Sequence, residues 1–265
     1  MGIQVPAHVT TEVLACLETA DEVLYLLADP VAGAWVERVN PNARSLHHLY
    51  RPGLDRDETY AAVVDEIMER VRRGGEVCAA FYGHAGVFVN PSHAAIRRAR
   101  QEGFEAHMLP GISAEACLFA DLGIDPAHAG CQSFEATELL LYEHDLDPTA
   151  ALVIWQVGVV GNFTYAPDGD TSRVPVLVDY LLGRYPPDHP VVLYEASTYA
   201  ICRPVVDTVP LRDLVRADLS PMATLYLEPR PSTSSPTMEE RLGLAQRRAV
   251  GTANKRAAAT LPFSS

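Results

Sequence analysis

Two stretches decide the fold: residues 81–88 read Phe81-Tyr82-Gly83-His84-Ala85-Gly86-Val87-Phe88, and residues 110–115 read Pro110-Gly111-Ile112-Ser113-Ala114-Glu115. Each stretch follows an apolar run and precedes a helical pattern. In α/β proteins, the backbone binds small molecules where the carboxyl end of a strand meets the amino end of a helix. Two such turns in this order predict one cofactor cleft.

The composition indicates a globular protein with a sizeable core. The chain has 265 residues, 48% of them hydrophobic, which suffices for one large domain or for two of ordinary size. No apolar stretch approaches the roughly 20 residues that cross a bilayer, and the N-terminus lacks a basic region followed by an apolar segment. We therefore expect no membrane partner and a cytoplasmic location.

Charge and cysteine usage narrow the choice of partners and cofactors. The formal net charge of −13 gives no long-range attraction for phosphate backbones, so we expect no nucleic-acid partner. The five cysteines are scattered singly, without a CxxC pair or a Cys/His cluster, and we interpret them as buried thiols in a reducing compartment. His47 and His48 are adjacent, so their side chains point apart. We expect no metal site.

The hydrophobic pattern alternates between short apolar runs and helical segments. The clearest helix covers residues 56–73, because Asp55 is an N-cap, acidic residues occupy the first turn and Gly74-Gly75 end it. Short apolar runs predict strands at 22–28, 77–82, 104–109, 131–136, 151–157, 190–195 and 222–228. Helical patterns predict further helices after Asp29-Pro30, from Pro91 to Gly103, and at 114–122, 173–184 and 210–217. Residues 77–109 predict a βαβ unit with parallel strands.

This alternation predicts an α/β protein of two lobes with the cleft between them. We place a boundary near Pro110-Gly111, which gives an N-terminal α/β lobe over 1–110 and a C-terminal α/β lobe over 111–230. After Pro229 the sequence becomes Pro-Ser-Thr-Ser-Ser-Pro, which is typical of a linker. We interpret 231–265 as a linker and a basic tail, with moderate helix propensity over 238–249, that docks on a partner or stays mobile.

The turn Pro110-Gly111-Ile112-Ser113-Ala114, preceded by a strand, a glycine-containing loop and a helix, resembles the tetrapyrrole methylase superfamily of S-adenosylmethionine-dependent methyltransferases. The resemblance extends from about residue 20 to residue 230. It implies a two-lobed class III methyltransferase fold with the cofactor cleft between the lobes. The superfamily's usual GxGPGD loop and GDP-like turn are replaced here by Ala28-Asp29-Pro30 and Gly83-His84-Ala85-Gly86.

These departures resemble a narrower group, the borosin peptide α-N-methyltransferases of the omphalotin type, which methylate backbone amides of a ribosomally made precursor. The matching segments are Ala28-Asp29-Pro30 with Trp35, residues 82–88, residues 108–115, residues 118–123 and Trp155-Gln156-Val157-Gly158. The resemblance implies S-adenosylmethionine as cofactor, iterative methylation, and a homodimer or a heterotetramer with the precursor. Fused members carry their substrate on a long C-terminal extension, whereas this sequence continues for only about 35 residues after its last expected strand. We therefore expect a split enzyme that acts on a precursor in trans.

The resemblance also implies the site residues, carried over one at a time. Tyr50 lies six residues before Arg56, Tyr60 four after it and Tyr82 twenty-two beyond that, which fits the family's catalytic spacing. The positions that match the family's cofactor residues are His84, Val87, Phe88, Ser113, Ala114, Gln156, Tyr194, Ala223 and Thr224.

These residue types suit methyl transfer to an amide. An amide nitrogen is a poor nucleophile because its lone pair is delocalised into the carbonyl, so its proton must be removed. A phenol, with a pKa of about 10, becomes a usable base when a guanidinium stabilises its anion. We expect Arg56 and Tyr60 to lie one helical turn apart. Tyr60 or Tyr50 would accept the proton, and Arg56 would stabilise the phenolate and the imidate-like oxygen. Tyr82 would position the substrate through its hydroxyl.

Two other functions are open at this stage. One is a small-molecule methyltransferase of the tetrapyrrole type, and the other is a catalytically silent domain that binds a peptide or a nucleotide-like ligand. Taken alone, Tyr60 is a core tyrosine on an apolar helix stripe, and Arg56 is a solvated first-turn residue. The presence of Tyr50, Arg56, Tyr60 and Tyr82 together argues against the silent domain.

Overall fold

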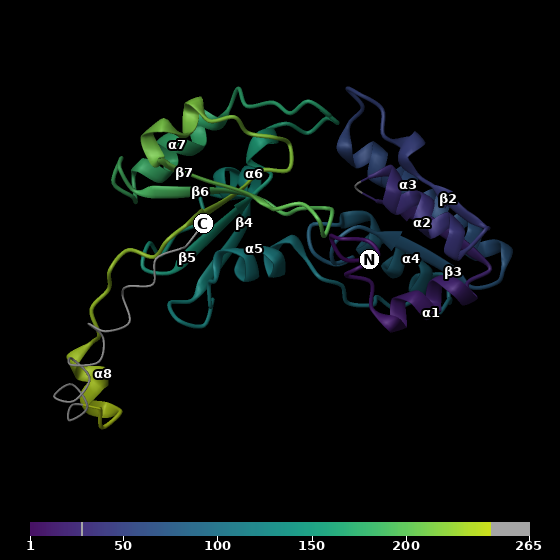
Figure 1. Ribbon diagram of the computed structural model, residues 1–265, viewed down its shortest axis with the longest axis horizontal. Coiled ribbons are helices and arrows are strands. Elements are labelled where there is room, and N and C mark those ends of the chain that lie inside the picture. The colour runs from purple at the N-terminus through teal and green to yellow at the C-terminus, as the bar shows by residue number, and fades with distance from the viewer. Residues whose placement is uncertain (28, 245–265) are drawn as a thin grey trace. The chain divides into compact units, whose positions relative to one another are not determined.

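The computed structural model describes residues 1–27 and 29–244 (Figure 1). The chain divides into two compact units, Met1–Pro229 and Arg230–Ser265. In the described part of the second unit the backbone forms α8 (Pro236–Arg241), and the helix expected over 238–249 extends past the described residues. Across 1–27 and 29–244, no helix combines the length and the apolarity needed to cross a membrane.

The first of two sheets in the unit Met1–Pro229 consists of three parallel strands in the order β2-β1-β3. These strands are β1 (Glu22–Leu26), β2 (Ala43–Ser45) and β3 (Val77–Phe81). Leu26 pairs with Phe81, so β1 and β3 end together. The loops that begin near Asp29 and Tyr82 therefore leave from the same carboxyl edge, where small-molecule sites of α/β proteins lie.

Helices cover both faces of this sheet because the residues of β1 alternate between two cores. The odd-numbered ones pack with α1 (Thr11–Thr19) and α2 (Pro30–Val39). The even-numbered ones pack with α3 (Arg56–Arg73) and α4 (Asn90–Gln101). This period of two is that of a strand with both faces buried.

The prediction for α3 is confirmed. Asp55 caps the helix through Oδ1, which accepts hydrogen bonds from the amides of Asp57 at 2.8 Å and Glu58 at 3.4 Å. Gly74, with a φ of 89°, follows its last residue. Arg56 is thus the first residue of the helix, and Tyr60 stands one turn further along the same face.

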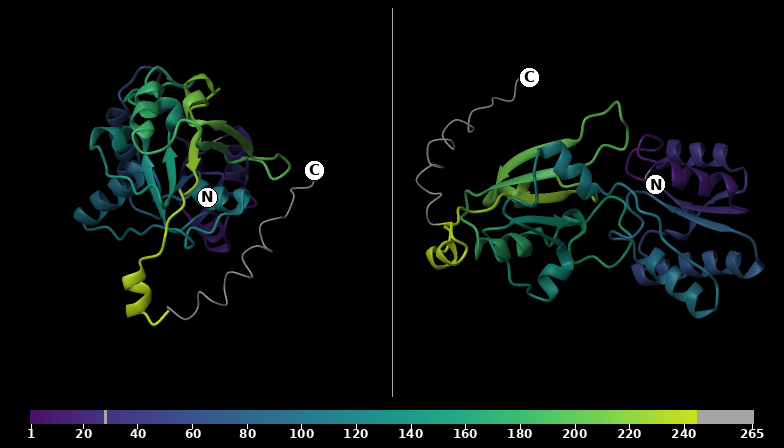
Figure 2. Two further views of the ribbon diagram at one scale, coloured as in Figure 1. Left: turned by 90° about the vertical axis from the view of Figure 1, so that its left-hand side faces the viewer. Right: turned by 90° about the horizontal axis from the view of Figure 1, so that it is seen from below.

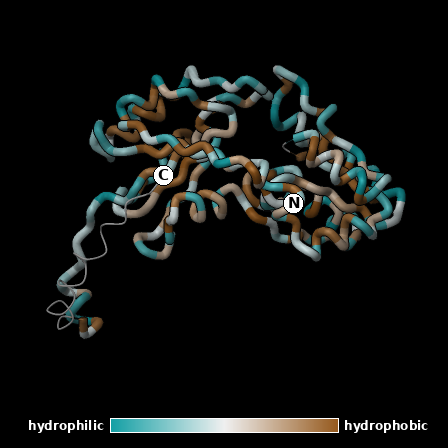
Figure 3. Tube along the Cα trace, in the orientation of Figure 1, coloured by the Kyte–Doolittle hydropathy of each residue, from teal (hydrophilic) through white to brown (hydrophobic). Residues whose placement is uncertain are grey.

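The second sheet has five strands in the order β4-β5-β8-β6-β7. Its strands are coloured from teal to yellow-green in Figure 2. They are β4 (Cys131–Glu135), β5 (Ala151–Trp155), β6 (Pro190–Glu195), β7 (Val205–Pro210) and β8 (Thr224–Leu227). β4 and β5 are parallel, and the other neighbouring pairs are antiparallel. The central strands are strongly apolar (Figure 3), as expected of strands covered on both faces.

The helices of this sheet are divided between its two faces. One face packs against α6 (Ala136–Leu141), α7 (Val174–Leu182) and the 3-10 helix η3 (Leu211–Arg216). The other packs against α5 (Ala114–Leu122). The strands of the first sheet all precede residue 110, and those of the second sheet all follow it. The boundary between two lobes at this residue stays a prediction.

The strand predicted at 104–109 is wrong, and with it the βαβ unit over 77–109. After α4, the Phe104 amide donates back to the Ala99 carbonyl at 2.9 Å. The Arg100 guanidinium then donates to the Ala106 carbonyl from Nε at 2.9 Å and from Nη2 at 2.6 Å. A side chain therefore takes an acceptor that a neighbouring strand would need.

Other differences are smaller. The helix expected at 210–217 is the 3-10 helix η3. The elements that were not expected from the sequence are α1, β2, α6, β7 and the short 3-10 helices η1 (His47–Leu49) and η2 (Val157–Val159). The remaining predicted strands and helices form within a few residues of their expected bounds.

Candidate functional site

The two glycine turns predicted to hold a cofactor lie against each other. Gly83, with a φ of 68°, pairs with Gly2, and each amide donates to the other's carbonyl at 2.9 Å. A Cβ atom on Gly111 would come within 2.8 Å of the Gly83 carbonyl oxygen. The φ of Gly111 lies outside the left-handed region, so this position requires glycine for space. The turn after β3 and the turn before α5 therefore meet, as expected from the sequence.

His84, Val87 and Phe88 lie on the loop after β3. His84 Nδ1 accepts a hydrogen bond from the Gly86 amide at 2.9 Å and so holds the turn. The side chains of Val87 and Phe88 are exposed. The Phe88 ring lies 5.2 Å, between centroids, from the ring of Trp155 at the end of β5. The loop of the first sheet thus contacts a strand end of the second.

Ser113 and Ala114 begin α5. Ser113 is the N-cap, and its Oγ accepts a hydrogen bond from the Ala116 amide at 3.1 Å. Ala114 is the first helical residue. The first amides of a helix have no acceptor within the helix, and the helix dipole favours an anionic group at this end. This helix start, next to the Gly83 turn, is suited to a carboxylate or a hydroxyl.

Gln156 follows β5 and reaches the first residue of α3. Its backbone is left-handed, with φ 60° and ψ 34°, and its Oε1 accepts a hydrogen bond from Arg56 Nη1 at 3.1 Å. Among the described residues, three non-glycine residues have a positive φ, namely Phe88, Glu143 and Gln156. Such a backbone costs of order 1–3 kcal/mol and is concentrated at functional sites. Two of the three are predicted cofactor residues.

Tyr194 and Thr224 lie in strands β6 and β8 of the second sheet and Ala223 directly precedes β8, and all three side chains are buried. The Tyr194 hydroxyl donates to Asp121 Oδ2 at 2.7 Å, and burial together with this carboxylate raises the tyrosine's pKa. Tyr194 and Ala223 also line a hollow of about 230 Å³. Within 1–27 and 29–244, no hydrogen bond links any of the three to Arg56, so the structure does not join them to the catalytic candidates.

Arg56 is held at both its backbone and its side chain by residues that follow β5. Its amide donates to the Phe163 carbonyl at 2.8 Å, and its Nη2 donates to the Asn162 carbonyl at 3.2 Å. With Gln156, the guanidinium therefore has two neutral acceptors. No carboxylate of the described residues forms an ion pair with Arg56. Its positive charge is available to neighbouring groups.

The three predicted catalytic tyrosines lie close enough to act on one another electrostatically. Burial raises the pKa of Tyr50, and Tyr60 and Tyr82 raise it further. Burial also raises the pKa of Tyr60, with smaller contributions from Asp57 and Glu135. Tyr82 keeps 39% of its surface exposed, yet the surrounding protein, with a contribution from Tyr60, raises its pKa too. All three phenols are therefore neutral at neutral pH.

Arg56 distinguishes two of these tyrosines from the third. Its charge lowers the pKa of both Tyr50 and Tyr60 against the effect of burial, whereas Tyr82 receives no such contribution. A phenolate at Tyr50 or Tyr60 would be stabilised by the guanidinium, as general-base chemistry requires. The structure brings the four catalytic candidates together, and their individual roles stay predictions.

Four further residues contact or influence the catalytic candidates and were not expected from the sequence. Asn162 and Phe163 hold Arg56, Tyr165 packs on Tyr50, and Glu135 influences Tyr60. All lie far from α3 along the sequence, so no periodicity or local spacing connects them with that helix. The available signal was Asn162 itself, because asparagine two residues before threonine favours a tight Asx turn.

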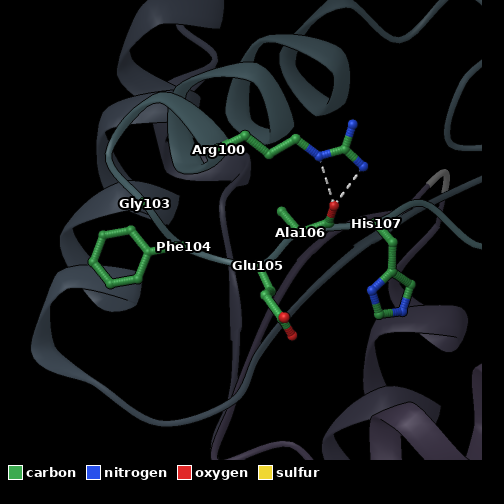
Figure 4. Close-up of a pocket in the computed structure, with 6 residues that line it drawn as sticks. All are labelled: Arg100, Gly103, Phe104, Glu105, Ala106 and His107. Carbon is green, nitrogen blue, oxygen red and sulfur yellow. Dashed lines mark hydrogen bonds between the residues drawn. The ribbon is translucent and has the colours of Figure 1, made fainter.

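A second hollow lies away from these residues, at the C-terminal end of α4 (Figure 4). Its volume is about 480 Å³, and its lining residues are Arg100, Gly103, Phe104, Glu105, Ala106 and His107. None of these is a predicted site residue, and the Arg100 guanidinium already donates twice to the Ala106 carbonyl. We assign it no role in the site.

Comparison with known proteins places this geometry in a family context. The family model described as Tetrapyrrole (Corrin/Porphyrin) Methylases matches residues 1–212. A curated relative from Coprinopsis marcescibilis, named methyltransferase/ribosomally synthesized type I borosin cyclic peptide precursor, is 40% identical over 86% of this chain and 60% of its own length. A relative from Omphalotus olearius, named as the omphalotin A precursor, is 38% identical over 88% of this chain and 57% of its own length. The chain thus spans about 60% of the length of these relatives.

Solved structures agree with this assignment at the level of the fold. Uroporphyrin-III C-methyl transferase from Thermus thermophilus, in complex with S-adenosyl homocysteine, superposes with a TM-score of 0.60 at 16% identity, over 86% of this chain and 94% of that one. The methyltransferase CobJ superposes with a TM-score of 0.58 at 18% identity, over 88% of this chain and 93% of that one. The expected tetrapyrrole-methylase-like α/β fold is confirmed. The chain belongs to the tetrapyrrole (corrin/porphyrin) methylase family.

Proposed function

We propose that this chain is an S-adenosylmethionine-dependent methyltransferase that N-methylates backbone amides of a ribosomally made peptide. The observation that carries the proposal is the uncompensated Arg56 guanidinium beside Tyr50 and Tyr60, a cation and two phenols at one site. Family membership supports methyl transfer, and the names of the curated relatives support a peptide as the acceptor.

The residues around the glycine turns fit this cofactor. The close approach of Gly111 to Gly83 brings the two turns together, and the N-terminus of α5 at Ser113 and Ala114 suits a methionine carboxylate or a ribose hydroxyl. His84, Val87, Phe88, Gln156, Tyr194, Ala223 and Thr224 complete the proposed set. When bound, S-adenosylmethionine supplies an electrophilic methyl group on a positively charged sulfonium.

The protein's own residues must remove the amide proton and stabilise the charge that results. Tyr50 or Tyr60 accepts the proton from the substrate nitrogen, because Arg56 favours the anionic form of both phenols. Arg56 also stabilises the imidate-like oxygen as negative charge develops on it. Tyr82 orients the amide through its hydroxyl. Burial keeps all three phenols protonated at rest, so the tyrosine that acts as base first releases its own phenolic proton to solvent, and the resulting phenolate, stabilised by Arg56, takes the amide proton.

A small-molecule acceptor of the tetrapyrrole type is the second candidate, favoured by the family model. The two candidates differ in the molecule that gains mass. Iterative action, supply of the peptide in trans, and assembly as a homodimer or as a heterotetramer with the peptide stay predictions that the same experiment addresses.

Intact-mass spectrometry tests the proposal. The full chain is expressed alone and together with the product of the nearest short reading frame, and fragmentation locates any added mass. Increments of one CH2 group on backbone nitrogens of the partner would support peptide N-methylation in trans, and several increments on one molecule would support iteration. Arg56→Ala is the inactive control. An unmodified partner and an unmodified chain, with S-adenosylmethionine bound, would overturn the peptide proposal in favour of a small molecule.

A further inference from the structure

The segment Asn162–Tyr165, here called the clamp segment, pairs with the chain just before α3. The Tyr165 amide donates to the Leu54 carbonyl at 3.0 Å, and the Gly53 amide donates to the Tyr165 carbonyl at 3.1 Å. With the bond from the Arg56 amide to Phe163, these contacts form a short antiparallel bridge. The clamp segment is therefore fastened to the loop that runs from Tyr50 to the start of α3 at Arg56.

The clamp segment has a conformation of its own. Asn162 Oδ1 accepts hydrogen bonds from the amide and the hydroxyl of Thr164, each at 2.8 Å. Its Nδ2 donates to Asp170 Oδ2 at 3.4 Å. This Asx turn fixes the backbone of Asn162, whose carbonyl oxygen accepts from Arg56. Loop residues that are held locally can impose their geometry on a neighbour instead of adapting to it.

Tyr165 carries this geometry to a second catalytic candidate. Its ring meets the Tyr50 ring edge to face, with 5.4 Å between centroids and 77° between planes. Such T-shaped pairs are preferred because the positive edge of one ring meets the negative face of the other. Tyr50 directly follows η1, and its partly buried side chain packs against the core beside α3, so the Tyr165 contact adds a restraint on the ring from the other sheet's side of the chain.

We propose that Tyr165 is a positioning residue of the methyl-transfer site. It holds the Tyr50 ring in the orientation from which the hydroxyl acts, while the same segment holds Arg56. The inference rests on the proposed function, because it assigns Tyr50 to the reaction. Tyr165 acts through Tyr50 and has no part in proton transfer itself.

Substitutions of Tyr165 test this role. Tyr165→Leu keeps an apolar side chain but loses the edge-to-face contact, and Tyr165→Phe keeps the ring. We expect kcat to fall about tenfold or more in the leucine variant, because small displacements of catalytic groups have effects of this size. The KM for the peptide and the affinity for the cofactor stay unchanged, and the phenylalanine variant restores most of kcat. Tyr142→Leu, at an exposed tyrosine of the same lobe, is the matched control.

A readout without activity keeps the inference separate from the proposed function. Hydrogen exchange of residues 50–60, followed by mass spectrometry, should be faster in Tyr165→Leu and normal in Tyr165→Phe. If Tyr165→Leu does not fold, Thr164→Val, which removes one bond to Asn162, takes its place with the same expectation. Unchanged exchange, or an unchanged kcat in an active enzyme, would overturn the inference. A wild-type protein that methylates no peptide would overturn the proposed function alone, because the exchange data would still decide the role of Tyr165.

Discussion

At the residue scale, Arg56 differs from the ion-paired arginines of the described residues in the neutrality of its partners. Arg70, Arg72, Arg73 and Arg98 each form ion pairs with carboxylates, whereas Arg56 donates to a side-chain amide and a backbone carbonyl. A carboxylate partner would cancel much of its field at the two phenols. Neutral acceptors hold the guanidinium in place and leave its charge to act on Tyr50 and Tyr60.

Replacing Arg56 tests whether this charge drives the chemistry. We expect Arg56→Ala to lower the single-turnover rate of methyl transfer by about 10²–10³-fold, the usual effect of losing a group that stabilises developing charge. Arg56→Lys keeps the charge but loses the planar fork, so its rate should be intermediate. Rapid-quench kinetics give the rates, and calorimetry should find cofactor affinity preserved. Equal rates in all three proteins would contradict the assignment.

Gln156→Glu tests the same idea through pH. A carboxylate at this position would pair with Arg56, whose Nη1 lies 3.1 Å from Gln156 Oε1. Arg56 now lowers the pKa of Tyr50 and Tyr60, so its neutralisation should raise both values. The rate of a base-dependent reaction rises as the base loses its proton, and the rising limb of kcat against pH should move to higher pH. An unchanged profile in an active variant would argue against a tyrosine base.

The sequence predicted the site unevenly at this scale, for a physical reason. Tyr50, Arg56, Tyr60 and Tyr82 lie within one lobe at intervals that can be read along the chain. Tyr165 and Asn162 reach the same place from more than a hundred residues away, through contacts that only the folded chain contains. Local spacing has no means of indicating such pairs.

At the element scale, the meeting of two turns depends on the absence of one side chain. Gly111→Ala would place a methyl group 2.8 Å from the Gly83 carbonyl, and the turns must then move apart. We expect cofactor affinity to fall about tenfold, because a displaced backbone no longer matches its ligand. Gly183→Ala is the control, since its Cβ would meet only the Tyr180 carbonyl, at 3.4 Å. Calorimetry of both variants decides, and equal affinities would show that the approach is unimportant.

Helices with capping residues could be predicted from the sequence. Strands whose backbone carbonyls bind a side chain instead of a neighbouring strand could not. Asp55 and Gly74 bound α3 through local chemistry that the sequence displays. The apolar run at 104–109 has the composition of a strand, but the Arg100 guanidinium occupies the Ala106 carbonyl. Which partner a backbone acceptor finds depends on tertiary structure, and strand propensity is correspondingly sensitive to context.

At the scale of the whole molecule, buried acids of high pKa predict sensitivity to alkali. Burial is the main cause that raises the pKa of Tyr25 and Tyr226 to about 12 and that of Cys78 and Cys117 to about 11. An acidic group whose pKa is higher in the folded than in the unfolded protein contributes stability at pH values below its unfolded pKa. This contribution is lost as the pH rises toward its folded pKa. The loss should begin near pH 9 for the thiols and continue from about pH 10 to 12 for the phenols.

Urea denaturation between pH 8 and pH 11 measures this loss. We expect the free energy of unfolding to decrease over that range, and Tyr226→Phe, which keeps the ring without the ionisable hydroxyl, to show a shallower decrease. The difference should be of order 1 kcal/mol at pH 11, since one pKa unit corresponds to about 1.4 kcal/mol. Parallel curves for the two proteins would contradict the contribution of Tyr226.

The clamp also sets an order of events during synthesis on the ribosome. Tyr50, Arg56, Tyr60 and Tyr82 emerge early, whereas Gln156 and the clamp segment emerge only after β5 has been translated. A nascent chain of about 150 residues therefore carries every catalytic candidate but none of the acceptors that orient the arginine. The two acceptors that hold the Arg56 guanidinium are therefore available only once this later sequence has been translated.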